Sequence, residues 1–169
     1  MTERLRLRAW EKCDLDAYAR IVADPEVMRH MGAALDREAA ARQMADFRDR
    51  GEVDGLAHWA AADRMTGELI GRIGLLRHED WPLDRENVEV GWLLARRWWG
   101  RGLATEGARA CVRHAFEVLG VPRVISLALP ENRRSRRVME RLGMSYRGRE
   151  HWRGHEHVWY AVERPRSEP

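Results

Sequence analysis

The segment from Glu89 to Glu106 constrains the fold more than any other part of this chain. An apolar strand that ends at Leu94 runs into a turn carrying Gly100 and Gly102, and a helix opens directly afterwards. At such a junction the unpaired backbone N–H groups and the dipole of the new helix favour an anion. Because glycine has no Cβ, both glycines can adopt a positive φ and let the backbone come close to a ligand.

The charge and the glycine spacing of this turn narrow the choice of ligand. Arg97 and Arg101 add positive charge at its rim. The spacing contains neither the Gly-Lys-Ser/Thr of a nucleotide triphosphate loop nor the Gly-x-Gly-x-x-Gly of a dinucleotide fold. We predict a site for a phosphate-bearing ligand held in some other way, with an ordinary strand-to-helix turn as the alternative.

The size and composition of the chain fit a single soluble domain. It has 169 residues, of which 44% are hydrophobic and 34% are charged, and this is enough for one continuous core. We expect one domain over residues 1–163 and a flexible tail over 164–169. No run approaches ~18 consecutive apolar residues, and the N-terminus alternates charge with leucine. We therefore expect a cytoplasmic protein with no membrane segment.

Apolar spacing and helix-capping residues predict the order of the elements. A half-buried strand is expected around Leu5 to Leu7, and helices are expected to begin after the capping residues Asp14 and Asp36. The second of these helices is predicted to end near residue 50, where Gly51 and Gly55 break the chain. The remaining expectations are strands near 57–62, 68–77 and 89–94, a helix over 103–119, a strand over 124–129, a helix over 132–141, and strands near 144–148 and 157–163. Antiparallel strands followed by strand-helix-strand-helix-strand indicate a mixed α+β sheet.

Motifs in this region resemble those of the GNAT acetyltransferases. Arg97-x-x-Gly100-x-Gly102 is similar to the Gln/Arg-x-x-Gly-x-Gly/Ala signature of that family, whose loop holds the pyrophosphate of acetyl-coenzyme A. The strand before the loop and the stretch that begins Asn132-x-x-Ser135 are similar to the branch containing ribosomal-protein N-terminal acetyltransferases. The resemblance implies an α+β GNAT acyl-CoA N-acyltransferase fold, with a mostly antiparallel central sheet, a splayed parallel strand pair and helices on both faces.

The resemblance also implies where acetyl-coenzyme A binds. In the family, backbone groups of the strand that enters the loop bind the pantetheine arm, and residues 124–129 correspond to the other lip of the opening. Gly91 in that strand is compatible with a bulge or a close ligand approach, or is a plain strand glycine. The positions that match the family's coenzyme-binding residues are Trp92, Leu93, Leu94, Arg97, Trp99, Gly100, Arg101, Gly102, Leu103, Ala104 and Asn132.

Two glutamates are candidates for the base that takes the proton of an attacking amine. Glu89 is flanked by Val88 and Val90, so strand alternation points its side chain away from the face that the valines occupy. We predict that Glu89 is the catalytic base, and the alternative is a solvent-facing or structurally ion-paired glutamate. Glu106 lies one turn into the helix and is expected to stabilise the helix start.

The group that assists the leaving thiolate departs from the family pattern. Many relatives have a tyrosine where this chain has Met139, and a thioether has no proton to donate. By resemblance, Ser135 is the predicted replacement, through a hydrogen bond to the sulfur or a water relay. The alternative is that Asn132 caps the helix and Ser135 is incidental.

The predicted activity is transfer of an acetyl group from acetyl-coenzyme A to a primary amine, by direct attack in a ternary complex. The acceptor is a protein N-terminal amine, which the branch resemblance favours, or a small amine. A noncatalytic coenzyme A-binding sensor or interaction module is the alternative function.

Charge and ligand patterns limit the other partners. The 30 basic and 27 acidic residues give a net charge of +3, too even a mixture to indicate nucleic acid. His151, His155 and His157 lack a cysteine or acidic pattern that would complete a metal site, so no metal is expected. The resemblance also allows a homodimer.

Residues 78–86 lie at the edge of the predicted acceptor cleft. Their acidic side chains and tryptophan suit binding of a cation, and the alternative is a polar hairpin loop.

Overall fold

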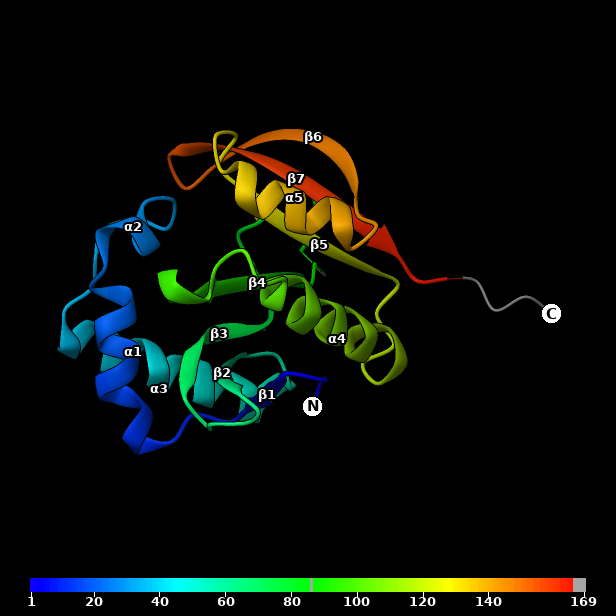
Figure 1. Ribbon diagram of the computed structural model, residues 1–169. Helices are drawn as coiled ribbons and strands as arrows, with labels where there is room; N and C mark the ends of the chain where they lie inside the picture. The colour runs from blue at the N-terminus through cyan, green and yellow to red at the C-terminus, as the bar shows by residue number, and fades with distance from the viewer. Residues whose placement is uncertain (86, 166–169) are drawn as a thin grey trace.

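The computed structural model describes residues 1–85 and 87–165, which form one sheet with helices on both faces (Figure 1). The strands are β1 (Leu5–Arg8), β2 (His58–Asp63), β3 (Leu69–Leu76), β4 (Glu89–Leu94), β5 (Arg123–Ala128), β6 (Ser145–Trp152) and β7 (His155–Glu163). The helices are α1 (Leu15–Val22), α2 (Pro25–Met28), α3 (Arg37–Asp54), α4 (Leu103–Glu117) and α5 (Arg133–Arg141), with 3-10 turns at Lys12–Asp14 and Arg96–Trp98.

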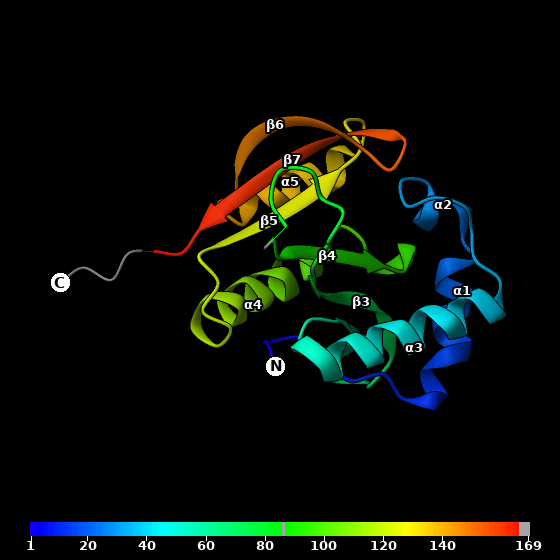
Figure 2. The same ribbon diagram turned by 180° about the vertical axis from the view of Figure 1, so that it is seen from behind.

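The seven described strands lie in the order β1-β2-β3-β4-β5-β7-β6. β4 and β5 are parallel, whereas the other neighbouring strands pair antiparallel. Figures 1 and 2 show α4 and α5 on one face of the sheet, and α1 and α3 on the other. The predicted mixed α+β class, with a mostly antiparallel sheet and one parallel pair, is confirmed.

Two apolar clusters hold these helices on the sheet. Val90 and Leu94 of β4 pack in the cluster under α4, together with Phe116 of that helix. Leu93 lies in the other cluster, with Tyr18 of α1. Consecutive residues of β4 therefore serve opposite faces, as the two-residue period of a strand requires, and β4 is buried from both sides.

Several element ends differ from the prediction. Asp36 caps α3 as predicted, accepting from Ala39 N at 2.7 Å. The helix then continues through Gly51, which was expected to break it, and ends at Gly55 with a left-handed φ of 72°. Asp14 precedes α1 but makes no side-chain cap hydrogen bond with it. Its carboxylate accepts from the Arg8 guanidinium instead, at 2.6 and 2.8 Å.

The C-terminal hairpin is longer than predicted. β6 and β7 are joined by the two residues Arg153 and Gly154, whose φ values of 50° and 81° suit a tight hairpin turn. Of the expected flexible tail, residues 166–169 lie outside the described residues. Among the residues that are described, no helix is both long and apolar enough to cross a membrane.

Candidate functional site

The parallel strands β4 and β5 begin side by side and then separate. Their one register pair joins Glu89 to Ile125, and Ile125 N donates to Val88 O at 2.9 Å. Slightly further along, the Ser126 hydroxyl donates to Val90 O at 2.9 Å. The described residues beyond this point form no β4–β5 register pair. We call the region between the diverging strands the β4–β5 opening.

Backbone groups of β4 are directed into this opening. Just after β4, Ala95 donates its N–H to Ile70 O. This bond shows which residues of β4 direct their backbone N–H and C=O groups toward β3, namely those in step with Ala95. Since alternate residues of an antiparallel strand bond to the same neighbour, the backbone groups of Trp92 and Leu94 face the β5 side. Leu94 O accepts from Trp99 Nε1 at 2.7 Å. The N–H and C=O of Trp92 and the N–H of Leu94 thus point toward the opening.

The loop after β4 leaves the start of α4 accessible. Gly100 and Gly102 have φ values of 75° and 77°, the positive φ that the sequence predicts. Gly102 is the N-cap of α4 and has no side chain with which to cap it. The N–H groups of Leu103 and Ala104, in the first turn, have no acceptor within the helix. This end of α4 therefore has the donors and the partial positive charge that an anion needs.

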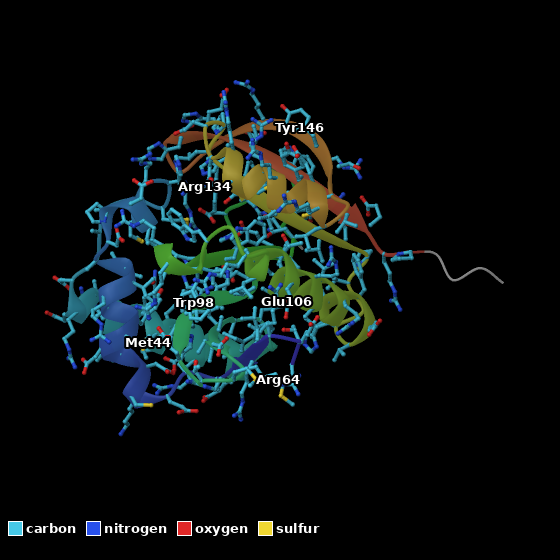
Figure 3. All side chains as sticks on the ribbon, viewed as in Figure 1. Met44, Arg64, Trp98, Glu106, Arg134 and Tyr146 are labelled. Atoms are coloured by element: carbon cyan, nitrogen blue, oxygen red, sulfur yellow. The ribbon has the colours of Figure 1, made fainter. Side chains whose placement is uncertain are left out.

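The arginines of the loop are held by neighbouring side chains. Arg97 forms an ion pair with Glu68, which directly precedes β3. The Arg101 guanidinium lies 4.8 Å from the ring centroid of Trp98, a side chain that Figure 3 labels beside the loop. Both arginines are exposed and lie at the rim of the loop, where the sequence places them.

A cavity of about 360 Å³ adjoins the loop on the α1 side. Its walls include Ile21 of α1, Asp24 at the N-cap of α2, Leu69 of β3, and Arg96 and Arg97 after β4. The loop is therefore accessible from the α1 side of the sheet as well as from α4.

The start of α5, which follows β5, lies on the other side of the β4–β5 opening from the loop after β4. Asn132 caps this helix by accepting from Ser135 N at 3.1 Å, and Ser135 is half-buried. The guanidinium of Arg134 lies 4.5 Å from the ring centroid of Trp99, so a side chain of α5 contacts the loop that follows β4. Met139 is fully buried in the apolar core. The position at which the resemblance implies a tyrosine thus offers no polar group to the opening.

Glu89 lies where β4 and β5 part. Its carboxylate accepts from Leu127 N at 3.3 Å and contacts Nε2 of His78 at 2.5 Å. The side chain is 14% exposed, and it lies on the opposite side of the strand from the buried Val88 and Val90. Geometrically, Glu89 is both a carboxylate at the apex of the opening and a member of a histidine–carboxylate pair.

The predicted segment 78–86 packs against the β6–β7 hairpin, although Glu86 lies outside the described residues. The rings of His78 and Trp152 form a T-shaped pair, with centroids 4.8 Å apart. Arg153 binds Asp80 through two hydrogen bonds of 2.8 and 2.9 Å, and these bonds lower the pKa of the Asp80 carboxyl. This segment is therefore tied to the hairpin next to Glu89.

Glu106 is directed away from the opening, toward the N-terminal residues. Its carboxylate accepts from Thr2 Oγ1 at 2.5 Å, from Arg4 N at 2.7 Å and from Arg4 Nε at 2.6 Å. Burial acts to raise the pKa of Glu106, but the hydrogen bonds from Thr2 and Arg4 outweigh it and lower that pKa. Glu106 thus joins the start of α4 to the strand that opens the chain.

One buried residue near the opening was not predicted from the sequence. His58 of β2 is 4% exposed, and a Cβ on Gly91 would come within 2.8 Å of its Nε2. The β3–β4 register runs through Gly91 without a shift. Of the alternatives for this glycine, a bulge in that ladder is therefore absent, and the missing Cβ leaves room for an imidazole. The sequence feature that could have indicated this site is the pair of strand glycines Gly74 and Gly91. Glycines in strands leave space for a neighbouring side chain, but the sequence does not identify that side chain as His58.

No group of three or more His, Cys, Asp or Glu side chains in the described part of the chain is arranged to hold a metal ion.

Comparisons with known proteins agree with this geometry. The sequence profile of the acetyltransferase (GNAT) domain matches residues 4–145. The chain is 34% identical over 151 residues to the uncharacterized protein YkkB of Bacillus subtilis, covering 86% of this chain and 84% of YkkB. An acetyltransferase structure from Agrobacterium tumefaciens is 32% identical with a TM-score of 0.83, covering 96% of this chain and 92% of that one. A ribosomal-protein alanine acetyltransferase from Vibrio fischeri shares the fold, with a TM-score of 0.75 at 15% identity over 100% of this chain and 98% of that one.

Proposed function

This chain belongs to the GNAT family and is an N-acetyltransferase of that family. From this premise we propose that it moves the acetyl group of acetyl-coenzyme A to a primary amine by direct attack in a ternary complex. One observation carries the proposal. The β4–β5 opening has free backbone groups along one side, leads to an uncapped helix N-terminus, and has a carboxylate at its apex.

The residues along β4 and the loop fit the coenzyme. The outward-facing backbone groups of Trp92 and Leu94 suit the amide groups of a pantetheine arm, and the first-turn N–H groups of α4 suit a pyrophosphate. Gly102 fits this role because a cap side chain there would occupy those donors. The residues proposed to hold acetyl-coenzyme A are Trp92, Leu93, Leu94, Arg97, Trp99, Gly100, Arg101, Gly102, Leu103, Ala104 and Asn132.

Glu89 is proposed to act as the base. A substrate amine is mostly protonated at neutral pH and must lose a proton before it can attack. Glu89 accepts that proton, directly or through water, while Leu127 N and His78 hold its carboxylate at the apex. The amine nitrogen then bonds to the acetyl carbon, and the carbon–sulfur bond breaks. The nitrogen loses its second proton and the departing thiolate takes one up, so coenzyme A leaves as a thiol. Ser135 is proposed to hydrogen-bond the departing sulfur.

The acceptor class proposed here is a primary amine, either a protein N-terminal amine or a small amine. The Vibrio fischeri relative acts on a ribosomal-protein alanine according to its name, but at 15% identity it supports the fold alone. The choice of a peptide N-terminus as the first acceptor to test rests on the motif resemblance around Asn132 and Ser135.

The test is acetyl-coenzyme A binding by calorimetry, followed by thiol release across a panel of N-terminal peptides and small amines. Binding with amine-dependent thiol release is the expected result. Binding without release across a broad panel would favour a noncatalytic coenzyme A sensor. Absence of binding would overturn the assignment of the opening as the coenzyme site.

A further inference from the structure

His58 lies at the end of a row of residues that crosses three strands. The register sets His58 opposite Gly74 on β3, and Gly74 opposite Gly91 on β4. Directly paired residues place their side chains on the same face, so the imidazole extends over two glycines toward the β4–β5 opening. A Cβ on Gly74 would come within 1.9 Å of Ala57 O, and one on Gly91 within 2.8 Å of His58 Nε2. The missing Cβ of Gly74 therefore lets the β2 backbone lie close to β3, and the missing Cβ of Gly91 leaves room for the ring.

The neighbours of His58 determine which ring nitrogen carries the proton. The Arg72 guanidinium contacts Nδ1 of His58. A guanidinium can donate hydrogen bonds but cannot accept them, so Nδ1 must be the acceptor. Burial, together with the positive charges of Arg72 and His78, holds the pKa of His58 well below its usual value. The ring is accordingly neutral and has its proton on Nε2.

The ring is held in place on its other sides as well. The Phe47 ring centroid lies 5.2 Å from that of His58 and 5.2 Å from the Arg72 guanidinium carbon. Trp10 Nε1 donates to the backbone oxygen of His58 at 2.7 Å. His58 Nε2 itself is buried and has no hydrogen-bond partner within residues 1–85 and 87–165. A buried donor without a partner is uncommon in folded proteins and calls for a reason.

We propose that His58 is a catalytic residue whose Nε2–H donates a hydrogen bond to the acetyl carbonyl oxygen of acetyl-coenzyme A, and that Arg72 is its positioning residue. The inference rests on the proposed function. When the amine attacks, the carbonyl π electrons move onto oxygen, and this donor stabilises the negative charge until the carbon–sulfur bond breaks and the carbonyl re-forms. The proton stays on His58 throughout. A neutral, fixed imidazole donor serves this purpose in other enzymes.

The spacing of residues along β4 supports separate roles for Glu89, as the base, and His58, as the hydrogen-bond donor. Glu89 and Gly91 are two residues apart and lie on the same face, so their Cα atoms are separated by about 7 Å along the strand. We expect the acetyl group and the attacking amine to lie between these two positions. Glu89 is then beside the nitrogen, and His58 is beside the oxygen.

Two substitutions separate the donor from the rest of the side chain. His58→Asn keeps an acceptor near the Arg72 guanidinium but is too short to reach Gly91. His58→Gln places an amide N–H close to the position of Nε2. We expect kcat to fall about 10²- to 10³-fold in the asparagine variant, as for loss of one oxyanion donor, and to be largely retained in the glutamine variant. Acetyl-coenzyme A affinity should stay near the wild-type value in both.

Infrared spectroscopy of acetyl-coenzyme A labelled with ¹³C at the carbonyl gives a readout that needs no acceptor. The carbonyl stretch of the bound label should lie at lower frequency in wild type and in His58→Gln than in His58→Asn. Equal frequencies in wild type and His58→Asn would overturn the proposal, as would equal losses of kcat, affinity and melting temperature in both variants. Failure of the wild-type protein to bind acetyl-coenzyme A would reject the proposed function itself.

Discussion

Replacing Glu106 by glutamine should weaken the fold without slowing the enzyme. This substitution is not a neutral exchange, because the carboxylate oxygen that accepts from Arg4 Nε becomes an amide N–H group facing another donor. A hydrogen bond to a charged group contributes about 1.5–3 kcal/mol. The Arg4 side chain is 47% exposed, and solvent screening reduces that contribution. We therefore expect a loss of about 1–2 kcal/mol in the free energy of unfolding.

Urea and thermal unfolding at neutral pH measure this loss. For a chain of this size, about 1 kcal/mol corresponds to a melting-temperature shift of roughly 2–4 °C. Glu38→Gln is the matched control, because Glu38 forms an exposed helix-surface pair with Arg42. Such pairs contribute about 0.5 kcal/mol or less. The Glu106 variant should retain the wild-type kcat, since its carboxylate is directed away from the opening.

The pH dependence gives a second check. The hydrogen bonds from Thr2 and Arg4 lower the pKa of Glu106 in the folded state. Its contribution is thus complete above the unfolded pKa of about 4.3, and it is lost as the pH falls through the lower, folded value. The stability gap between wild type and variant should be constant near neutrality and narrow in acid. A gap that widens in acid, or a large fall in kcat at wild-type stability, would refute the anchoring role.

Three further perturbations test the site and the core. Glu89→Gln should lower kcat at neutral pH by about 10²- to 10⁴-fold with nearly unchanged acetyl-coenzyme A affinity, and an unchanged pH–rate profile would remove Glu89 as the base. Gly100→Val and Gly102→Val should each weaken acetyl-coenzyme A binding in calorimetry, because a β-branched side chain opposes the left-handed backbone; wild-type affinity in both would contradict the phosphate-loop assignment. Burial raises the pKa of Cys111 to about 12, so a thiol reagent at pH 8 should label the exposed Cys13 in the folded protein and both cysteines in urea. Equal labelling rates for the two thiols before unfolding would argue against the packing described for α4.

The junction that starts at β4 was predictable because its signals are local. A glycine in a turn and an acidic residue before a helix act within a few residues, and Gly102 and Asp36 take the predicted conformation and cap. The end of α3 was not predictable in the same way. A glycine such as Gly51 weakens a helix without stopping it, so the helix continued to the left-handed Gly55.

The placement of the His58 ring could not be predicted from the residues near it in sequence. Gly91 leaves room for this ring, and Gly74 lets the backbone of β2 lie close to β3. Both glycines are distant from His58 in sequence and meet it only through strand register. Within its own strand, Gly91 is compatible with a bulge, a close ligand approach or nothing special, and those interpretations cannot be separated without knowing the neighbouring side chain. The tautomer depends in turn on Arg72, a buried cation on the strand between them. The donor that we propose for the acetyl oxygen is thus a property of three adjacent strands, and no window of sequence contains it.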